Sequence, residues 1–165
     1  MTATGSKRRI DFLLSPFGLD GQDVRATAVE LDVGAEAPSA TVWAMHPERV
    51  MESRIATVQS LGIDDPHAMA QLRMSIAVAR EWSRFLLRDE SIAERDRVRA
   101  VLRLNERIFR KCVSEHRFRQ LFSERRIDPF DDVLVDDDRL PEQFRDRRYP
   151  QMVAALADRR PAEDH

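Results

Sequence analysis

The sequence predicts an α+β fold, in which a short antiparallel β-element precedes a bundle of about five helices. Two observations predict this class. Apolar and polar residues alternate with period two over 27–33, and a second apolar run follows at 40–45, as expected for strands. After Pro47 the apolar residues recur every three or four positions, which is typical of helices. The chain therefore divides into a flexible N-terminus (1–8), a β-element (9–46), a helical domain (47–158) and a disordered tail (159–165).

The β-element is expected to hold about three strands. Residues 10–14 form a short apolar run and are the first strand candidate. The runs at 27–33 and 40–45 are joined by a short loop that contains Gly34 and Pro38. Such a connection favours a hairpin.

Proline, glycine and acidic residues divide the region after Pro47 into helices. Pro47 fits the first position of a helix and Gly62 its end. A second helix is predicted from Asp64-Asp65-Pro66. Its main apolar residues cover one face, and a second set of apolar residues widens that face. We therefore expect this helix to be central and buried on two sides. That second set is Met74, Val78, Trp82 and Phe85.

Local signals also place the last three helices. Ser91 and Glu94 match a capping box at the start of the third helix. The fourth is short and carries Phe118. Leu140-Pro141 introduces the last helix, which Pro150 is expected to break or kink.

Composition restricts the classes of function. The chain has 165 residues, with 27 lysines and arginines against 29 aspartates and glutamates. This balance argues neither for a general nucleic-acid binder nor for a membrane-surface protein. The single cysteine, Cys112, excludes an intrachain disulfide and is expected to be a buried thiol. No signal peptide or membrane-spanning run is recognisable, so we expect a cytoplasmic protein.

Two residues near the N-terminus are candidates for chemistry. Asp11, in the predicted strand 10–14, could supply a carboxylate to Mg²⁺. Phosphoryl-transfer sites need two or three such acids, so Asp11 could instead face solvent or pair with an arginine such as Arg54. His46 lies where the last strand meets the first helix, and a hydrogen-bonding role at the helix start is favoured over catalysis.

Arginines are concentrated between residues 103 and 126, with phenylalanines among them. This pattern could form a phosphate-binding or RNA-binding face. Glutamates in the same helices favour a solvated face of salt bridges instead. The candidate binding residues are Arg107, Arg110, Arg117 and Arg119.

An acidic run follows this region. It could imitate nucleic-acid phosphates toward a basic partner, or it could be a charged surface turn, which is favoured. Arg145, Arg147 and Arg148 lie close enough in sequence to neutralise it. The candidate binding residues in the run are Asp131, Asp132, Asp136 and Asp137.

Several segments match one known pattern together. They are Ile10-Asp11-Phe12-Leu13 with Gly18-Leu19-Asp20, Met45-His46-Pro47 with Met51-Glu52-Ser53-Arg54-Ile55, Gln71-Leu72-Arg73 with Ala79-Arg80-Glu81, Leu104-Asn105-Glu106-Arg107-Ile108, and Phe144-Arg145-Asp146-Arg147-Arg148-Tyr149-Pro150-Gln151. Together these segments resemble the C-terminal part of bacterial nucleotidyltransferase-like proteins of the polymerase-beta superfamily. That group includes abortive-infection toxins.

The resemblance implies where the metal-binding acids of such a protein would lie. In that family a glycine-serine turn and a strand with two metal-binding acids come first, and a later strand supplies a third acid. Asp11 matches the third acid, so the resemblance makes it a vestigial metal ligand. The turn and the first two acids would lie before Met1.

The leading hypothesis is therefore a non-catalytic interaction protein without a cofactor. It would bind a protein or protein–nucleic-acid partner in a phage, mobile-element or defence context, for example by inhibiting a host defence complex. One alternative is the C-terminal half of a split or truncated Mg²⁺-dependent nucleotidyltransferase, completed by another chain. A second alternative is an RNA-binding module that uses the arginine-rich face.

Overall fold

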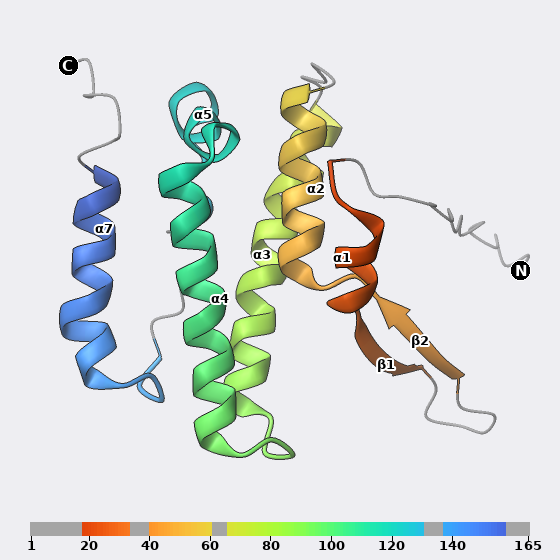
Figure 1. Ribbon diagram of the computed structural model, residues 1–165, viewed down its shortest axis with the longest axis vertical. Coiled ribbons are helices and arrows are strands. Elements are labelled where there is room, and N and C mark those ends of the chain that lie inside the picture. Colours follow the sequence, from red (N-terminus) through yellow and green to blue (C-terminus); the bar gives the residue numbers. More distant parts are fainter. Residues whose placement is uncertain (1–17, 34–39, 61–65, 131–136, 158–165) are drawn as a thin grey trace, which may run out of the picture.

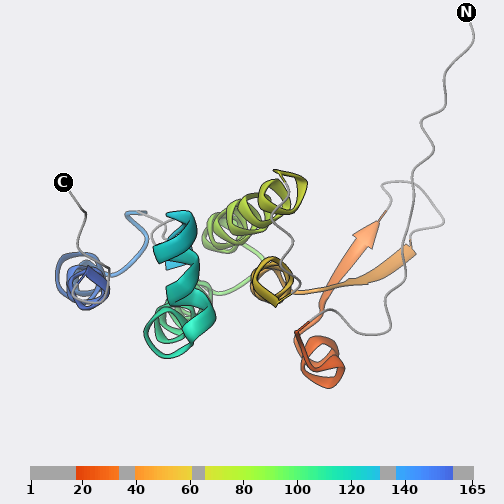
Figure 2. The same ribbon diagram turned by 90° about the horizontal axis from the view of Figure 1, so that it is seen from above.

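A small hairpin and a group of longer helices make up the described part of the protein (Figure 1). The structure is a computed structural model and describes residues 18–33, 40–60, 66–130 and 137–157. Seen from above, the hairpin extends away from the helices (Figure 2). The predicted α+β class is confirmed.

The hairpin pairs β1 (Val29–Val33) with β2 (Ala40–Ala44) in antiparallel register, with Glu30 opposite Trp43. The two strands predicted at 27–33 and 40–45 are thus confirmed. The described residues contain two strands and not three, and the strand predicted at 10–14 lies outside them. A short helix, α1 (Gly21–Ala26), precedes β1 and is capped by the Asp20 carboxylate.

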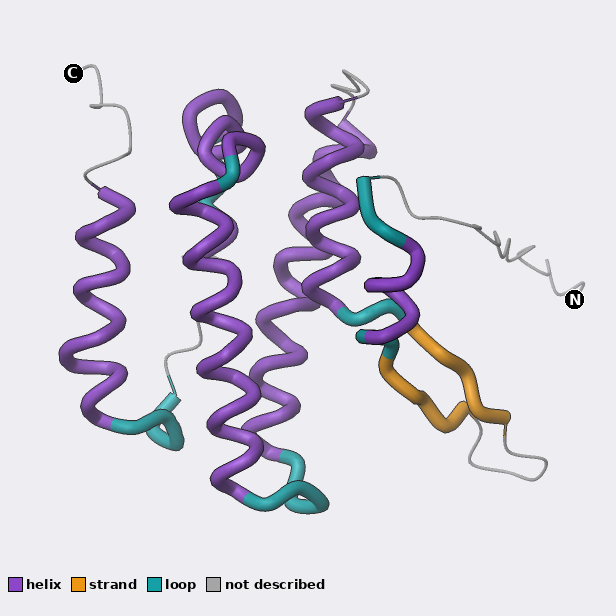
Figure 3. Tube along the Cα trace, viewed as in Figure 1, coloured by secondary structure: helices purple, strands orange, loops and turns teal. Residues whose placement is uncertain are grey.

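Among the described residues, five α-helices follow the hairpin, which agrees with the predicted number of about five. Figure 3 distinguishes them from the strands. Pro47 and Pro66 each occupy the first position of a helix, where the missing N–H leaves no bond unmade. A π-helical turn, η1, leads directly into the last helix. The elements are α2 (Pro47–Ser60), α3 (Pro66–Arg88), α4 (Glu94–Ser114), α5 (His116–Arg125), η1 (Phe144–Arg148) and α7 (Tyr149–Ala157).

The capping box predicted at Ser91 is wrong. Helix α4 begins at Glu94, and the residue before it is Ala93. The Ser91 side chain instead donates a hydrogen bond to the Asp89 carboxylate at 2.6 Å, and its backbone N–H donates a second at 3.0 Å. The bond from the Ser91 hydroxyl, followed by the one from the backbone, lowers the pKa of Asp89. The serine therefore closes the turn after α3, because the aspartate acceptor lies nearer than the helix start.

Pro150 widens the last helix where a break or kink was predicted. The Tyr149 N–H donates to the Phe144 carbonyl, five residues earlier. Proline has no N–H, and its ring crowds the carbonyl four residues before it. A π turn ahead of Pro150 accommodates that ring, so the chain continues as α7.

The main core lies where α2, α3, α4, α5 and α7 meet. Met51, Ile55, Leu72 and Ile108 are fully buried there, and Cys112 is buried as predicted. A smaller cluster of Leu87, Val101 and Leu140 lies near the other end of α3 and α4. Each buried side chain of this size stabilises the fold by about 1.5–3 kcal/mol. These contacts fix α3 against α2 and α4 along one side.

Candidate functional site

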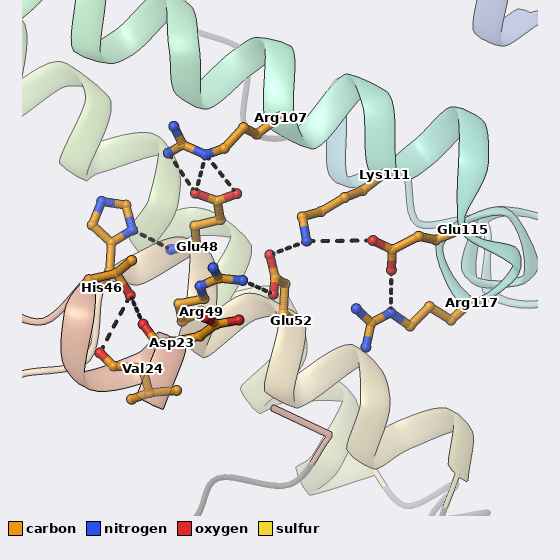
Figure 4. A network of polar contacts seen from close by, with 11 residues as sticks. Asp23, Val24, His46, Glu48, Arg49, Glu52, Arg107, Lys111, Glu115 and Arg117 are labelled. Atoms are coloured by element: carbon orange, nitrogen blue, oxygen red, sulfur yellow. Dashed lines mark hydrogen bonds and ion pairs between the residues drawn. The ribbon is translucent and has the colours of Figure 1, made fainter. Parts of the chain in front are cut away.

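Charged side chains of α2 and α4 point toward one another beside the core (Figure 4). Glu48 and Glu52 are 4% and 1% exposed. The Arg107 Nη2 lies 2.7 Å from the Glu48 Oε2, and its Nε contacts both carboxylate oxygens. The Lys111 Nζ lies 2.7 Å from the Glu52 Oε1. We call Glu48, Glu52, Arg107 and Lys111 the polar seam.

Further ion pairs extend the polar seam along α2 and from α4 to α5. The Arg49 Nη1 donates to the Glu52 Oε2 at 2.9 Å. Lys111 also lies 3.5 Å from Glu115, which in turn accepts from Arg117 at 2.7 Å. Every charge in the polar seam thus faces an opposite charge. Removing the partner of a buried carboxylate strongly destabilises a protein. The polar seam therefore fixes how α2 lies on α4.

His46 acts at the start of α2, as favoured from the sequence. Its Nδ1 accepts a hydrogen bond from the Glu48 N–H at 3.3 Å. Its ring also meets the Trp82 ring edge-on, with centroids 6.0 Å apart. Burial lowers the pKa of His46 below its ordinary value of 6.5, and the Glu48 carboxylate only partly opposes this. A neutral imidazole keeps the Nδ1 lone pair that caps the helix.

The candidate arginines of the predicted RNA-binding face are engaged by the protein itself. Arg107 pairs with Glu48, Arg110 with Glu106 at 3.3 Å, and Arg117 with Glu115. Arg119 donates to the Val113 carbonyl at 2.7 Å. The geometry therefore supports the salt-bridged alternative, because an RNA phosphate would have to compete with these carboxylates.

The acidic run is partly described. Asp137 pairs with Arg139 at 3.0 Å, and Asp138 pairs with Arg145 at 3.2 Å. Arg145 thus neutralises the run as predicted, whereas Arg148 pairs with Glu106 on α4. The other candidate residues of the run lie outside the described residues: Asp131, Asp132 and Asp136.

The proposed metal ligand Asp11 also lies outside the described residues. Its suggested partner Arg54 is half-buried on α2 and has no ion pair with a described residue. Within the described ranges, no three His, Cys, Asp or Glu side chains gather as metal ligands would. No helix in those ranges is long and apolar enough to cross a membrane.

The sequence predicted a second buried face of α3 at Met74, Val78, Trp82 and Phe85. Trp82 is partly buried against the core, but the other three residues are exposed. Met74 is 65% exposed, Phe85 is 54% exposed and Val78 is 45% exposed. The prediction fails for these three because the buried residues of α3 lie on its other side. That side buries Leu72, Ser75, Ile76, Ala79, Ser83 and Leu87. We call Met74, Val78, Trp82 and Phe85 the apolar stripe.

The apolar stripe forms one side of a shallow groove. Pro47, Ala77 and Glu81 complete its lining, and its volume is about 370 Å³. The Trp82 and Phe85 rings stack with centroids 5.5 Å apart, which holds both in place. Contiguous apolar patches on a protein surface mark sites of interaction. These apolar residues were recognised in the sequence, but the sequence did not indicate which face of α3 is exposed.

No family model, curated protein or solved structure matches this chain. The resemblance to nucleotidyltransferase-like proteins therefore stays a prediction from sequence. The functional interpretation rests on the geometry of the described residues.

Proposed function

We propose that this chain is a non-catalytic interaction protein that holds a helix of a partner protein on the apolar stripe of α3. One observation carries the proposal: Met74, Val78 and Phe85 are each exposed by about half or more, in line along one helix. Covering such surface yields roughly 25 cal/mol per Å² of apolar area removed from water. A partner that fits the groove would gain this free energy.

The spacing of the apolar stripe favours a helix as the occupant. Its residues follow one another after four, four and three positions, which is the ridge that another helix packs against. The stripe is about 16 Å long at 1.5 Å per residue. A partner helix of about three turns, with apolar residues at positions i, i+4 and i+7, matches it.

The proposed ancestry and biological context come from the sequence. Descent from a nucleotidyltransferase-like protein, in a phage, mobile-element or defence setting, is supported by the motifs around His46-Pro47 and Tyr149-Pro150. The enzyme-half alternative depends on Asp11 and is a separate hypothesis. A nucleotide-transfer assay with Asp11→Ala and a complementing chain tests it, since unchanged activity would exclude a metal role for this residue.

The interaction proposal is tested by locating the contact and then measuring it. A photo-crosslinking amino acid at position 74 identifies the protein bound to the apolar stripe in cells. Isothermal titration calorimetry with that purified protein then compares wild type with Val78→Glu. Ala100→Glu is the matched control, because it places the same carboxylate at an exposed position of α4.

We expect Val78→Glu to weaken binding by at least about tenfold, because desolvating an unpaired carboxylate costs more than about 1.4 kcal/mol. Ala100→Glu should bind like wild type, and both variants should melt near the wild-type temperature. Equal affinity for the two variants would overturn the proposal. Light scattering that shows a dimer dissociated by Val78→Glu would also overturn it, since a second copy would then occupy the stripe.

A further inference from the structure

Three arginines line a hollow on another face of α3. Arg73 and Arg80 come from α3, and Arg126 is the C-cap residue that follows α5. Arg73 and Arg80 are seven residues apart, so they point the same way, about 10 Å apart along the helix. The hollow has a volume of about 310 Å³, and its other lining residues are Ile76, Ala77 and Ile127.

These three guanidinium groups differ from the candidate arginines of α4 and α5. Arg107, Arg110 and Arg117 each face a glutamate. Within the part of the chain that the structure describes, Arg73, Arg80 and Arg126 have no carboxylate partner, and no acidic residue lines the hollow. Like charges that share a concave surface raise its positive potential, which attracts an anion.

The backbone at Arg126 provides a second observation. This residue has φ 54° and ψ 35°, a left-handed conformation. Glycine is the usual residue at such a helix end, because a Cβ is disfavoured there. Arg126 nevertheless adopts this conformation, and it lines the hollow.

We propose that the hollow of Arg73, Arg80 and Arg126 binds a phosphate group. A planar guanidinium donates two parallel hydrogen bonds to phosphate oxygens, and three such groups from two helices can surround one phosphate. The described lining has no aromatic ring on which a base could stack. The site therefore reads the phosphate and not the base, whether the phosphate belongs to a free polyphosphate or to a nucleic-acid backbone.

Pyrophosphate titrated into the purified full chain at low salt tests the site. Arg73→Gln and Arg80→Gln should each weaken binding by about tenfold, the effect of losing one charge-assisted contact. Arg147→Gln is the matched control, because it removes an exposed arginine of η1 that has no ion pair among the described residues. The control should bind within about twofold of wild type.

Arg126→Gly separates binding from folding. Glycine keeps the left-handed conformation and removes the guanidinium, so the Tm should rise while pyrophosphate binding weakens about tenfold. The absence of saturable binding to wild type would overturn the proposal. Equal affinity of wild type, Arg80→Gln and Arg126→Gly would overturn it as well.

A single-stranded RNA oligonucleotide identifies the source of the phosphate. A backbone ligand should bind more tightly than pyrophosphate, with an affinity that falls steeply with salt and is reduced by Arg80→Gln. A free polyphosphate as the ligand predicts that the oligonucleotide binds no more tightly. Val78→Glu should leave pyrophosphate binding unchanged, so this inference and the proposed function fail separately.

Discussion

The polar seam and the apolar stripe reverse the usual distribution of residues. Between α2 and α4, Glu48 and Glu52 are almost fully buried. On the outer face of α3, Met74 is mostly exposed. Charged groups are thus inside the molecule and large apolar groups outside it, at two places on one small helical bundle.

The difference shows that burial follows from neighbours more than from residue type. The glutamates of the polar seam are buried because Arg107 and Lys111 on α4 lie within 3 Å of them. Met74, Val78 and Phe85 of the apolar stripe are exposed because the buried residues of α3 lie on its other side. Buried, paired charges fix one arrangement of the helices, while the exposed apolar stripe is the surface on which we propose that a partner binds.

The largest effect is expected from breaking the polar seam. Lys111→Met removes the cation nearest to Glu52, which is 1% exposed and keeps only Arg49. Breaking a buried ion pair from one side typically costs about 3–5 kcal/mol. Urea unfolding monitored by circular dichroism should show a loss of about 3 kcal/mol in the free energy of unfolding.

A double variant sharpens this test. Glu52→Leu combined with Lys111→Met replaces the pair by apolar groups of similar size, which is often neutral. We expect the double variant to recover most of the lost stability, as a double-mutant cycle would show. A single variant as stable as wild type would mean that the polar seam does not hold α2 on α4.

A smaller effect is expected from truncating side chains on the buried and the exposed face of α3. Leu72 is fully buried and Met74 is 65% exposed, two residues further along. Leu72→Ala should cost about 2–5 kcal/mol, because it leaves a cavity in the core. Met74→Ala should change stability by less than about 0.5 kcal/mol. Similar losses for both, measured by urea unfolding, would show that the apolar stripe is covered within the folded chain.

The smallest effect is a pH dependence at the join between the hairpin and α2. Burial lowers the pKa of His46 in the folded state. Neutral His46 therefore contributes its full stabilisation of the fold above pH 6.5, the ordinary pKa that it has in the unfolded chain. This stabilisation is lost as the pH falls below that value, because the unfolded chain binds the proton more readily than the folded chain. Wild type should lose more stability than His46→Asn between about pH 7.5 and about pH 5.5. Asparagine can cap the helix without titrating there, so equal losses would contradict this role.

Local signals in the sequence were enough to predict most of the described helices and strands. Pro47 and Pro66 begin helices as predicted. The period-two pattern located the first strand of the hairpin, and an apolar run located the second. The role of His46 could also be predicted, because a helix cap involves residues next to it in sequence. The prediction at Ser91 failed within the same short range, where Asp89 competed for its hydroxyl.

Contacts between distant residues could not be predicted in this way. Glu48 and Arg107 are 59 residues apart. The sequence placed Arg107 on a face that could bind RNA or form salt bridges with glutamates of the same helices, and it did not suggest Glu48. The hollow of Arg73, Arg80 and Arg126 likewise needs α5 to end beside α3.

The sequence by itself determined the class of fold, most helix boundaries and the burial of Cys112, because period, proline and composition act locally. Only the tertiary structure decided which apolar face of α3 is buried, which charges are paired and which arginines of the described residues lie together in a hollow. Those properties depend on how close the helices lie in space. A pattern of residue types along one helix contains no record of that distance.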